Sequence, residues 1–119
     1  MKIEGPGTRL TIHLGESDQH KHRPLYHEIV QRAREAGLAG ATVMRGIEGF
    51  GASTRLHTAR LLTLSEDLPV VIIIVDRTDR IESFLPTLDE LIGEGLVVRE
   101  EVEIILYRGR ELQGEGGAT

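Results

Sequence analysis

The chain has no cysteine among its 119 residues. Without cysteine there are no disulfide bonds, no thiolate nucleophile and no metal site built on sulfur ligands. This composition fits a reducing compartment, and we expect a cytoplasmic protein.

Aromatic residues are also scarce, at 3% of the sequence. The core must therefore be built from Leu, Ile, Val and Ala, and an aromatic stacking platform for single-stranded nucleic acid is missing. Basic residues are outnumbered, 14 against 19 acidic ones, which gives a net charge of -5, and they are scattered along the chain. No electrostatic footprint for duplex nucleic acid is present, so we expect no nucleic-acid partner.

Long apolar segments are absent. The longest apolar run, 70–75, is far shorter than the roughly 20 residues that a membrane-spanning helix needs. The first seven residues lack the apolar centre of a signal peptide. A length of 119 residues suits one domain, which we place at 7–112, followed by a glycine-rich and flexible tail at 113–119.

In its first half, the chain has the apolar spacing of a strand, a helix and a second strand. Residues 8–14 alternate apolar and polar side chains, as a half-buried strand does. From Leu25 onward apolar residues recur at helical spacing, and Pro24 before them suits a first helical position. Gly37 is expected to end this helix in a left-handed conformation. The second strand is predicted at 41–47.

The second half predicts another strand, helix and strand. Residues 70–75 are almost all β-branched and do not alternate, which is typical of a central strand covered on both faces. Thr78 can cap the helix that follows, and Pro86 inside that helix predicts either a kink or a later start, near Leu85. A last strand is expected at 97–107. Its inward side chains are predicted to be Val102, Ile104 and Leu106.

Together these elements give the order βαββαβ. Right-handed crossovers place both helices on one face of a four-stranded antiparallel sheet. The fold class is therefore predicted to be α+β, a ferredoxin-like sandwich. The other face of the sheet needs a cover, which in a chain of this length we expect to be another subunit.

The connection between 41–47 and 70–75 is longer than two sheet strands need, which indicates a functional loop. It opens at 49–51, where two glycines flank a phenylalanine and allow positive φ angles. Backbone N–H groups there could surround an anion, although a hinge that only lets the chain leave the strand is the alternative. Gly46, just before this segment, indicates a bulge or a close backbone approach.

Four motifs, taken in order and at their separations, resemble the PII signalling superfamily. The likeness is closest to the PII-like family known as domain of unknown function 190, and it covers about residues 7–108. The motifs are Pro24-Leu25-Tyr26, Arg45-Gly46-Ile47-Glu48-Gly49-Phe50-Gly51, Ser65-Glu66-Asp67-Leu68-Pro69-Val70-Val71 and Val75-Asp76. The resemblance implies a homotrimer with adenine nucleotides bound in the clefts between subunits. It also implies that the loop after 49–51 grips a partner protein, by analogy one in a membrane transport or ion-homeostasis system.

Candidate ligand-binding residues follow from this resemblance and from anion-binding chemistry. Arg45 and Arg55 are suited to bidentate anion contacts, or else to surface ion pairs. His57 could contact a phosphate or titrate as a switch, or be a plain exposed histidine. The full set of candidates is Thr42, Arg45, Gly49, Phe50, Gly51, Ser53, Arg55, His57, Gly93, Gly95 and Arg108.

The sequence departs from the PII pattern at three places. Where PII supplies a Gly-Lys pair to the phosphates, the turn reads Gly93-Glu94-Gly95-Leu96. An AMP-like nucleotide is therefore expected over ATP, because the cationic partner of a triphosphate is lost. One residue more separates Thr42 from Gly49 than in PII. Arg108 and Arg110 are shifted by about one position relative to the terminal arginines of PII, which would reverse the face on which they lie.

An alternative function is metal homeostasis, as in the copper-tolerance trimers of the same superfold. Nitrogen and oxygen ligands for Cu or Zn lie close in sequence: His20, His22, His27, Asp18 and Glu16. The competing interpretation of these residues is a solvated loop that leads into a helix. Catalysis is not expected, because no set of acid, base and nucleophile can be assembled and no Walker loop occurs, and no cofactor is required.

Overall fold

A computed structural model describes residues 2–52 and 67–109 of the chain. In chain order the elements are β1 (Lys2–Gly15), β2 (Gln19–His20), β3 (Arg23–Pro24), α1 (Leu25–Glu35), β4 (Thr42–Arg45), β5 (Pro69–Asp76), α3 (Thr78–Leu91) and β6 (Leu96–Arg108). The predicted flexible tail, 113–119, lies outside the described residues.

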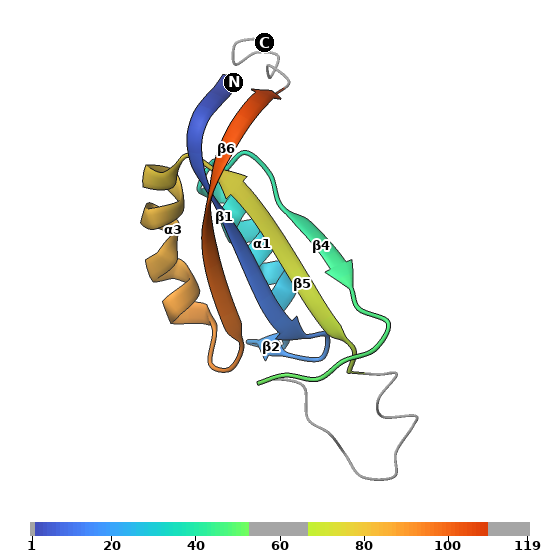
Figure 1. Cartoon of the computed structure of the whole chain (residues 1–119). Helices are drawn as coiled ribbons and strands as arrows, with labels where there is room; N and C mark the ends of the chain where they lie inside the picture. Colours follow the sequence, from blue (N-terminus) through green and yellow to red (C-terminus); the bar gives the residue numbers. More distant parts are fainter. Residues whose placement is uncertain (1, 53–66, 110–119) are drawn as a thin grey trace.

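Four of the strands form one antiparallel sheet in the order β4-β5-β1-β6, with both helices on the same side of it (Figure 1). This confirms the predicted α+β class and the ferredoxin-like arrangement. β2 and β3 form a separate hairpin just before α1. Lys21 and His22 connect them with φ angles of 51° and 69°, as the two central residues of a tight hairpin turn require.

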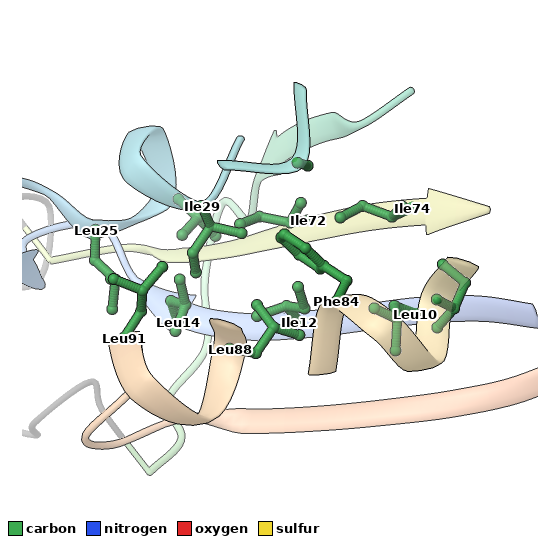
Figure 2. Close-up of a cluster of buried hydrophobic side chains, with 13 residues drawn as sticks. Leu10, Ile12, Leu14, Leu25, Ile29, Ile72, Ile74, Phe84, Leu88 and Leu91 are labelled. Carbon is green, nitrogen blue, oxygen red and sulfur yellow. The ribbon is translucent and has the colours of Figure 1, made fainter. Parts of the chain in front are cut away.

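The core fills the space between the sheet and the helices. Because side chains alternate along a strand, β1 and β5 turn every second residue toward the helices. The core residues are Leu10, Ile12, Leu14, Val70, Ile72 and Ile74 from the strands and Leu25, Ile29, Ala33, Ile81, Phe84, Leu88 and Leu91 from the helices. Figure 2 shows these side chains meeting between the layers. Full burial of a leucine, isoleucine or phenylalanine contributes about 1.5–3 kcal/mol, so this layer is the main source of stability.

Within one chain, β5 is covered by the helices on one face only. Its residues alternate between buried and half-buried, because both helices cover the same face of the sheet. We call the opposite side the open face. Cross-strand partners share a face, so the register assigns these apolar residues to the open face: Met44, Val71, Ile73, Val75, Val98, Val102 and Ile104. The β-branched pattern of β5 thus fits a second cover that one chain does not supply.

Gly37 ends α1 in the left-handed conformation that the sequence predicted. Its φ is 79°. The N–H of Gly37 donates to the carbonyl of Arg34 at 3.0 Å, and the N–H of Leu38 donates to that of Ala33 at 3.1 Å. These bonds satisfy carbonyls that the end of a helix leaves without partners.

α3 runs uninterrupted through Pro86, so the alternative start near Leu85 is wrong. Glu82 and Pro86 are both exposed, which lets water bond the carbonyl that loses its helical partner. Thr78 is the first helical residue rather than the cap, and its hydroxyl lies 2.8 Å from that of Thr8. Of the described helices, neither is long and apolar enough to cross a membrane.

β1 and β6 extend beyond the rest of the sheet as a two-stranded arm (Figure 1). Residues 2–7 of β1 pair only with β6, since pairing with β5 starts at Thr8. The predicted strand also began at Thr8, because the Gly-Pro-Gly segment 5–7 interrupts the alternation before it. We call residues 2–7 and 102–108 the arm.

The arm contains a β-bulge. Gly5 pairs with Ile104, and the next pair is Ile3 with Tyr107, so two steps along β1 match three steps along β6. One extra residue moves everything beyond it to the other face of the strand. Tyr107 therefore shares the face of Ile104. Of the side chains predicted to point inward, Val102 and Ile104 lie on the open face, away from the helices, and Leu106 is 52% exposed.

Candidate functional site

The loop that opens at 49–51 begins at the end of the sheet where β1 ends and β6 starts. A small cavity of about 120 Å³ lies there, lined by His13, Leu14, Phe50, Gly51, Ala52, Pro69 and Leu96. Residues 50–52 and Leu96, which are far apart in the sequence, therefore meet at this point. We call it the hinge end of the sheet.

Two glycines at the hinge end adopt conformations that other residues rarely adopt. The φ angle is 154° at Gly49 and 155° at Gly95. A Cβ atom at Gly49 would lie 3.2 Å from Cγ of Pro69, and one at Gly95 would lie 3.0 Å from the carbonyl oxygen of His13. At Gly93, by contrast, a Cβ would meet nothing within 4 Å. Backbone geometry thus requires glycine at 49 and 95.

Replacing Gly95 by alanine should lower the free energy of unfolding by about 1–3 kcal/mol, because the positive φ and the contact with His13 both oppose a side chain. Gly93→Ala is the matched control and should change it by less than about 0.5 kcal/mol. Urea unfolding followed by circular dichroism measures both variants. Equal midpoints for the two would contradict the assignment.

Gly46 approaches the start of β5 closely, as the sequence indicated. Its N–H donates to the carbonyl of Pro69 at 2.7 Å, and a Cβ on Gly46 would lie 2.9 Å from Cγ of Pro69. The neighbouring Arg45 shares the face of its cross-strand partner Val70, and its guanidinium pairs with the carboxylate of Glu16. The sequence left two roles open for Arg45, an anion contact or a surface ion pair. In this structure Arg45 forms the ion pair.

A larger cavity, of about 340 Å³, lies toward the other end of the sheet. Its lining residues are Ile3, Ala39, Gly40, Ala41, Thr42, Ile73, Val75, Ile104, Leu106 and Tyr107. Among these described residues none is charged, and Thr42 and Tyr107 contribute side-chain hydroxyl groups. We call this space the Thr42 cavity, after the candidate residue that lines it.

Tyr107 was not among the predicted site residues, because plain alternation places it on the face opposite to Ile104. The bulge brings it onto the face of Ile104, and its hydroxyl donates to the carbonyl of Ala39 at 3.0 Å. The same extra residue reverses the face of Arg108 relative to plain alternation along β6.

Asp76 is a fully buried carboxylate at the end of β5. Its Oδ2 accepts hydrogen bonds from the N–H of Ala39 at 2.9 Å and from Nε of Arg80 at 3.2 Å. Its Oδ1 accepts one from the N–H of Arg77 at 2.6 Å, and Arg80 also donates to the carbonyl of Gly37. The sequence presented Asp76 only as part of a motif, whereas the structure makes it the link between β5, α3 and the segment before β4.

The described candidates fall into two groups. The hinge end holds Gly49, Phe50, Gly51, Gly93 and Gly95, and Arg45 lies beside it, opposite Val70 at the start of β5. Thr42 lines the larger cavity, and Arg108 ends the arm. Along β6, Leu96 and Arg108 are roughly 40 Å apart at about 3.3 Å per residue. Thr42 is closer, because it pairs with Ile73, four residues along β5 from Pro69, which is roughly 13 Å. One chain therefore does not bring Arg108 to the hinge end. Ser53, Arg55 and His57 lie outside the described residues.

The histidines considered for a metal site do not gather. His20 and His22 belong to the hairpin before α1, and His27 is exposed on α1. Asp18 accepts a hydrogen bond from a backbone N–H at 3.0 Å, and Glu16 already pairs with an arginine. In the described part of the chain, no group of three or more His, Asp or Glu residues could hold a metal ion. The metal alternative thus finds no site there.

Sheet order, helix placement and the loop beside a glycine hinge define a PII-like fold. Solved structures with this fold include CPII from Thiomonas intermedia K12 bound to ADP, AMP and acetate, with a TM-score of 0.54 and 18% identity, covering 91% of this chain and 93% of that one. The apo form of CPII, a nitrogen regulatory PII-like protein, has a TM-score of 0.51 and 18% identity, covering 87% and 97% of the two chains. At this identity the likeness establishes the fold alone.

The chain belongs to the family known as domain of unknown function 190, described as "Uncharacterized ACR", whose profile matches residues 7–104. A UPF0166 protein of Aquifex aeolicus (strain VF5) is 38% identical over 98 residues, which are 81% of this chain and 90% of the relative. A UPF0166 protein of Methanocaldococcus jannaschii is 34% identical over 101 residues, 84% of this chain and 91% of the relative. The predicted membership is therefore confirmed, and these names assign no activity.

Proposed function

We propose that this protein is a non-catalytic PII-like sensor that binds an adenine nucleotide between the subunits of a homotrimer. The observation that carries the proposal is the separation of Arg108, at the end of the arm, from the candidate residues at the hinge end of the same sheet. Arg108 and the hinge end can contact one ligand only if the hinge end of one chain adjoins the arm of another.

Contact between opposite ends of identical chains is heterologous, and it closes into a ring when the rotation between neighbours allows. A ring of three, the assembly that the resemblance to PII implies, would form three equivalent clefts. The open face supports such an assembly, because β5 and β6 place valine and isoleucine side chains there, on either side of Arg9, Thr11 and His13 of β1. Exposed apolar area of this kind marks a surface that binds another protein.

The chemistry of the two ends favours an adenine nucleotide with few phosphates. The Thr42 cavity has the volume of a small-ligand pocket, about 340 Å³, and its uncharged lining with two hydroxyls suits a planar base. At the hinge end, Leu96 lines the cavity in place of a cation. The PII-like protein CPII was solved with ADP and AMP, which supports this ligand class by analogy.

The loop after 49–51 is the proposed contact to a partner protein. Its described start is anchored, because Gly46 bonds to the carbonyl of Pro69 and Gly49 packs against the same proline. A ligand at the hinge end would contact the residues from which the loop departs. For this to work as a signal, the nucleotide must bind one arrangement of the loop better than another.

Leu96→Lys should restore a phosphate-binding cation at the hinge end. We expect the affinity for ATP relative to AMP to rise about tenfold, since a charge-assisted hydrogen bond contributes about 1.5–3 kcal/mol and 1.4 kcal/mol is tenfold. Isothermal calorimetry with both nucleotides measures the ratio.

Glu94→Lys is the matched control for this variant. It adds at least as much positive charge to the same turn, but residue 94 does not line the hinge-end cavity. We therefore expect a smaller change in the ATP to AMP ratio, one that salt screens. The same ratio in Leu96→Lys as in the wild type would contradict the placement of the phosphates.

A further inference from the structure

The backbone of Ala39 is held from two sides by side chains that are distant in sequence. Its N–H donates to Oδ2 of Asp76 at 2.9 Å. Its carbonyl accepts from the hydroxyl of Tyr107 at 3.0 Å. Asp76 lies at the end of β5 and Tyr107 lies in the arm, so two separate parts of the sheet hold one residue.

Ala39 is the first of three residues that separate two cavities, and we call these residues, 39–41, the wall. Residues 39–41, Ala-Gly-Ala, line the Thr42 cavity on one side. The same three residues line a second cavity of about 260 Å³ on the α1 side, together with Val30, Ala33, Arg34 and Leu38. A wall with space on both sides and no large side chains gains little from packing. Ala41 packs against the core, so the position of Ala39 and Gly40 is set chiefly by the two hydrogen bonds to Ala39.

The two anchors of this wall differ in how firmly they are held. Asp76 is fully buried and also bonded to Arg77 and Arg80, so this anchor is fixed by the fold. Tyr107 is part-buried and lies on the arm, where the bulge directs it toward Ala39. β-bulges commonly redirect a side chain next to a binding site.

We propose that Tyr107 is a positioning residue for the Thr42 cavity: its hydroxyl holds residues 39–41 in the arrangement that binds the ligand. This inference rests on the proposed function, because it takes the nucleotide to occupy this cavity. The inference also couples the arm to the cavity. Movement of the arm would break the hydrogen bond from Tyr107 to Ala39, and residues 39–41 could then shift.

Tyr107→Phe removes the hydroxyl and keeps the ring. We expect the affinity for AMP to fall between about two- and tenfold, the range of one neutral hydrogen bond. Tyr26→Phe, on α1, is the matched control and should leave the affinity unchanged. Calorimetry gives the affinities, and thermal unfolding of each variant without ligand shows whether the fold is retained.

A rescue variant separates positioning from direct contact. A Cβ atom on Gly40 would meet nothing within 4 Å, and the φ angle of Gly40 is not positive. Gly40→Ala therefore narrows the conformations of the wall without strain. If Tyr107 acts through the wall, Gly40→Ala should recover part of the affinity that Tyr107→Phe loses. A hydroxyl that contacts the ligand directly would not be replaced in this way.

Tyrosine fluorescence gives a second readout, because the chain has two tyrosines and no tryptophan. In Tyr26→Phe, Tyr107 is the remaining emitter, and AMP should change its emission. If the wild type binds AMP and Tyr107→Phe binds it equally well, or if Gly40→Ala recovers nothing, the inference is overturned. If the wild type binds no nucleotide at all, the proposed function itself fails.

Discussion

Replacing Val98 by lysine should turn the assembly into single chains. Val98 lies opposite Thr11 of β1 on the open face, which we assign to contact between subunits. A lysine there would place an unpaired charge in every interface, which costs several kcal/mol per buried ion. Light scattering after size exclusion should give the mass of one chain instead of three.

The neighbouring Val97 provides a matched control. Val97 and Val98 are both 39% exposed in the single chain, but Val97 pairs with Ile12 and so lies on the helix-covered face. Val97→Lys should therefore keep the mass of the wild type. An unchanged mass for Val98→Lys, or equal loss of assembly in both variants, would contradict the role of the open face.

Replacing Asp76 by alanine should lower the free energy of unfolding by about 3–5 kcal/mol, the usual cost of removing one partner of a buried ion pair. The loss has a clear cause in the structure. Asp76 is fully buried, and its carboxylate accepts from Arg80, from Ala39 N–H and from Arg77 N–H. Urea unfolding measures the change.

Asp79→Ala is the control for this variant. Asp79 is exposed at the start of α3, where hydrogen bonds from the Arg77 side chain lower its pKa. An exposed pair of this kind contributes little to folding, so the unfolding midpoint should stay close to that of the wild type. Asp76→Ala unfolding at the wild-type midpoint would show that the buried network is not needed for stability.

The arrangement of strands and helices could be predicted because the apolar residues keep the period of each element. Alternation at 8–14 and helical spacing from Leu25 are local patterns, and burial of one face preserves them. Gly37 was predictable for the same reason, since a left-handed helix end favours glycine wherever it occurs.

The arm and its bulge could not be predicted, because their cause is not local. The Gly-Pro-Gly sequence of segment 5–7 favours a turn, and the segment is a strand only because it pairs with β6. The bulge then moves Tyr107 to the other face of β6. The alternation of apolar and polar residues in the sequence does not indicate this change. The β-branched run of β5 likewise does not say whether the second cover comes from the same chain or, as we expect, from another subunit.

The candidate site was predictable in part. The two glycine segments do lie at one end of the sheet, and Thr42 does line a cavity. The partner of Arg45 and the bonds of Asp76 depend on which side chains the fold brings together, so spacing alone could not supply them. The separation of Thr42 from the hinge end likewise emerges only once the strands are paired.

The central claim is that an adenine nucleotide binds between subunits. Isothermal calorimetry of AMP against the wild type and Val98→Lys tests it most directly. We predict saturable binding near one AMP per chain in the wild-type assembly, and loss of that binding in the single-chain variant. No heat of binding with AMP, ADP or ATP, or AMP binding that is equally strong in single chains, would contradict the account.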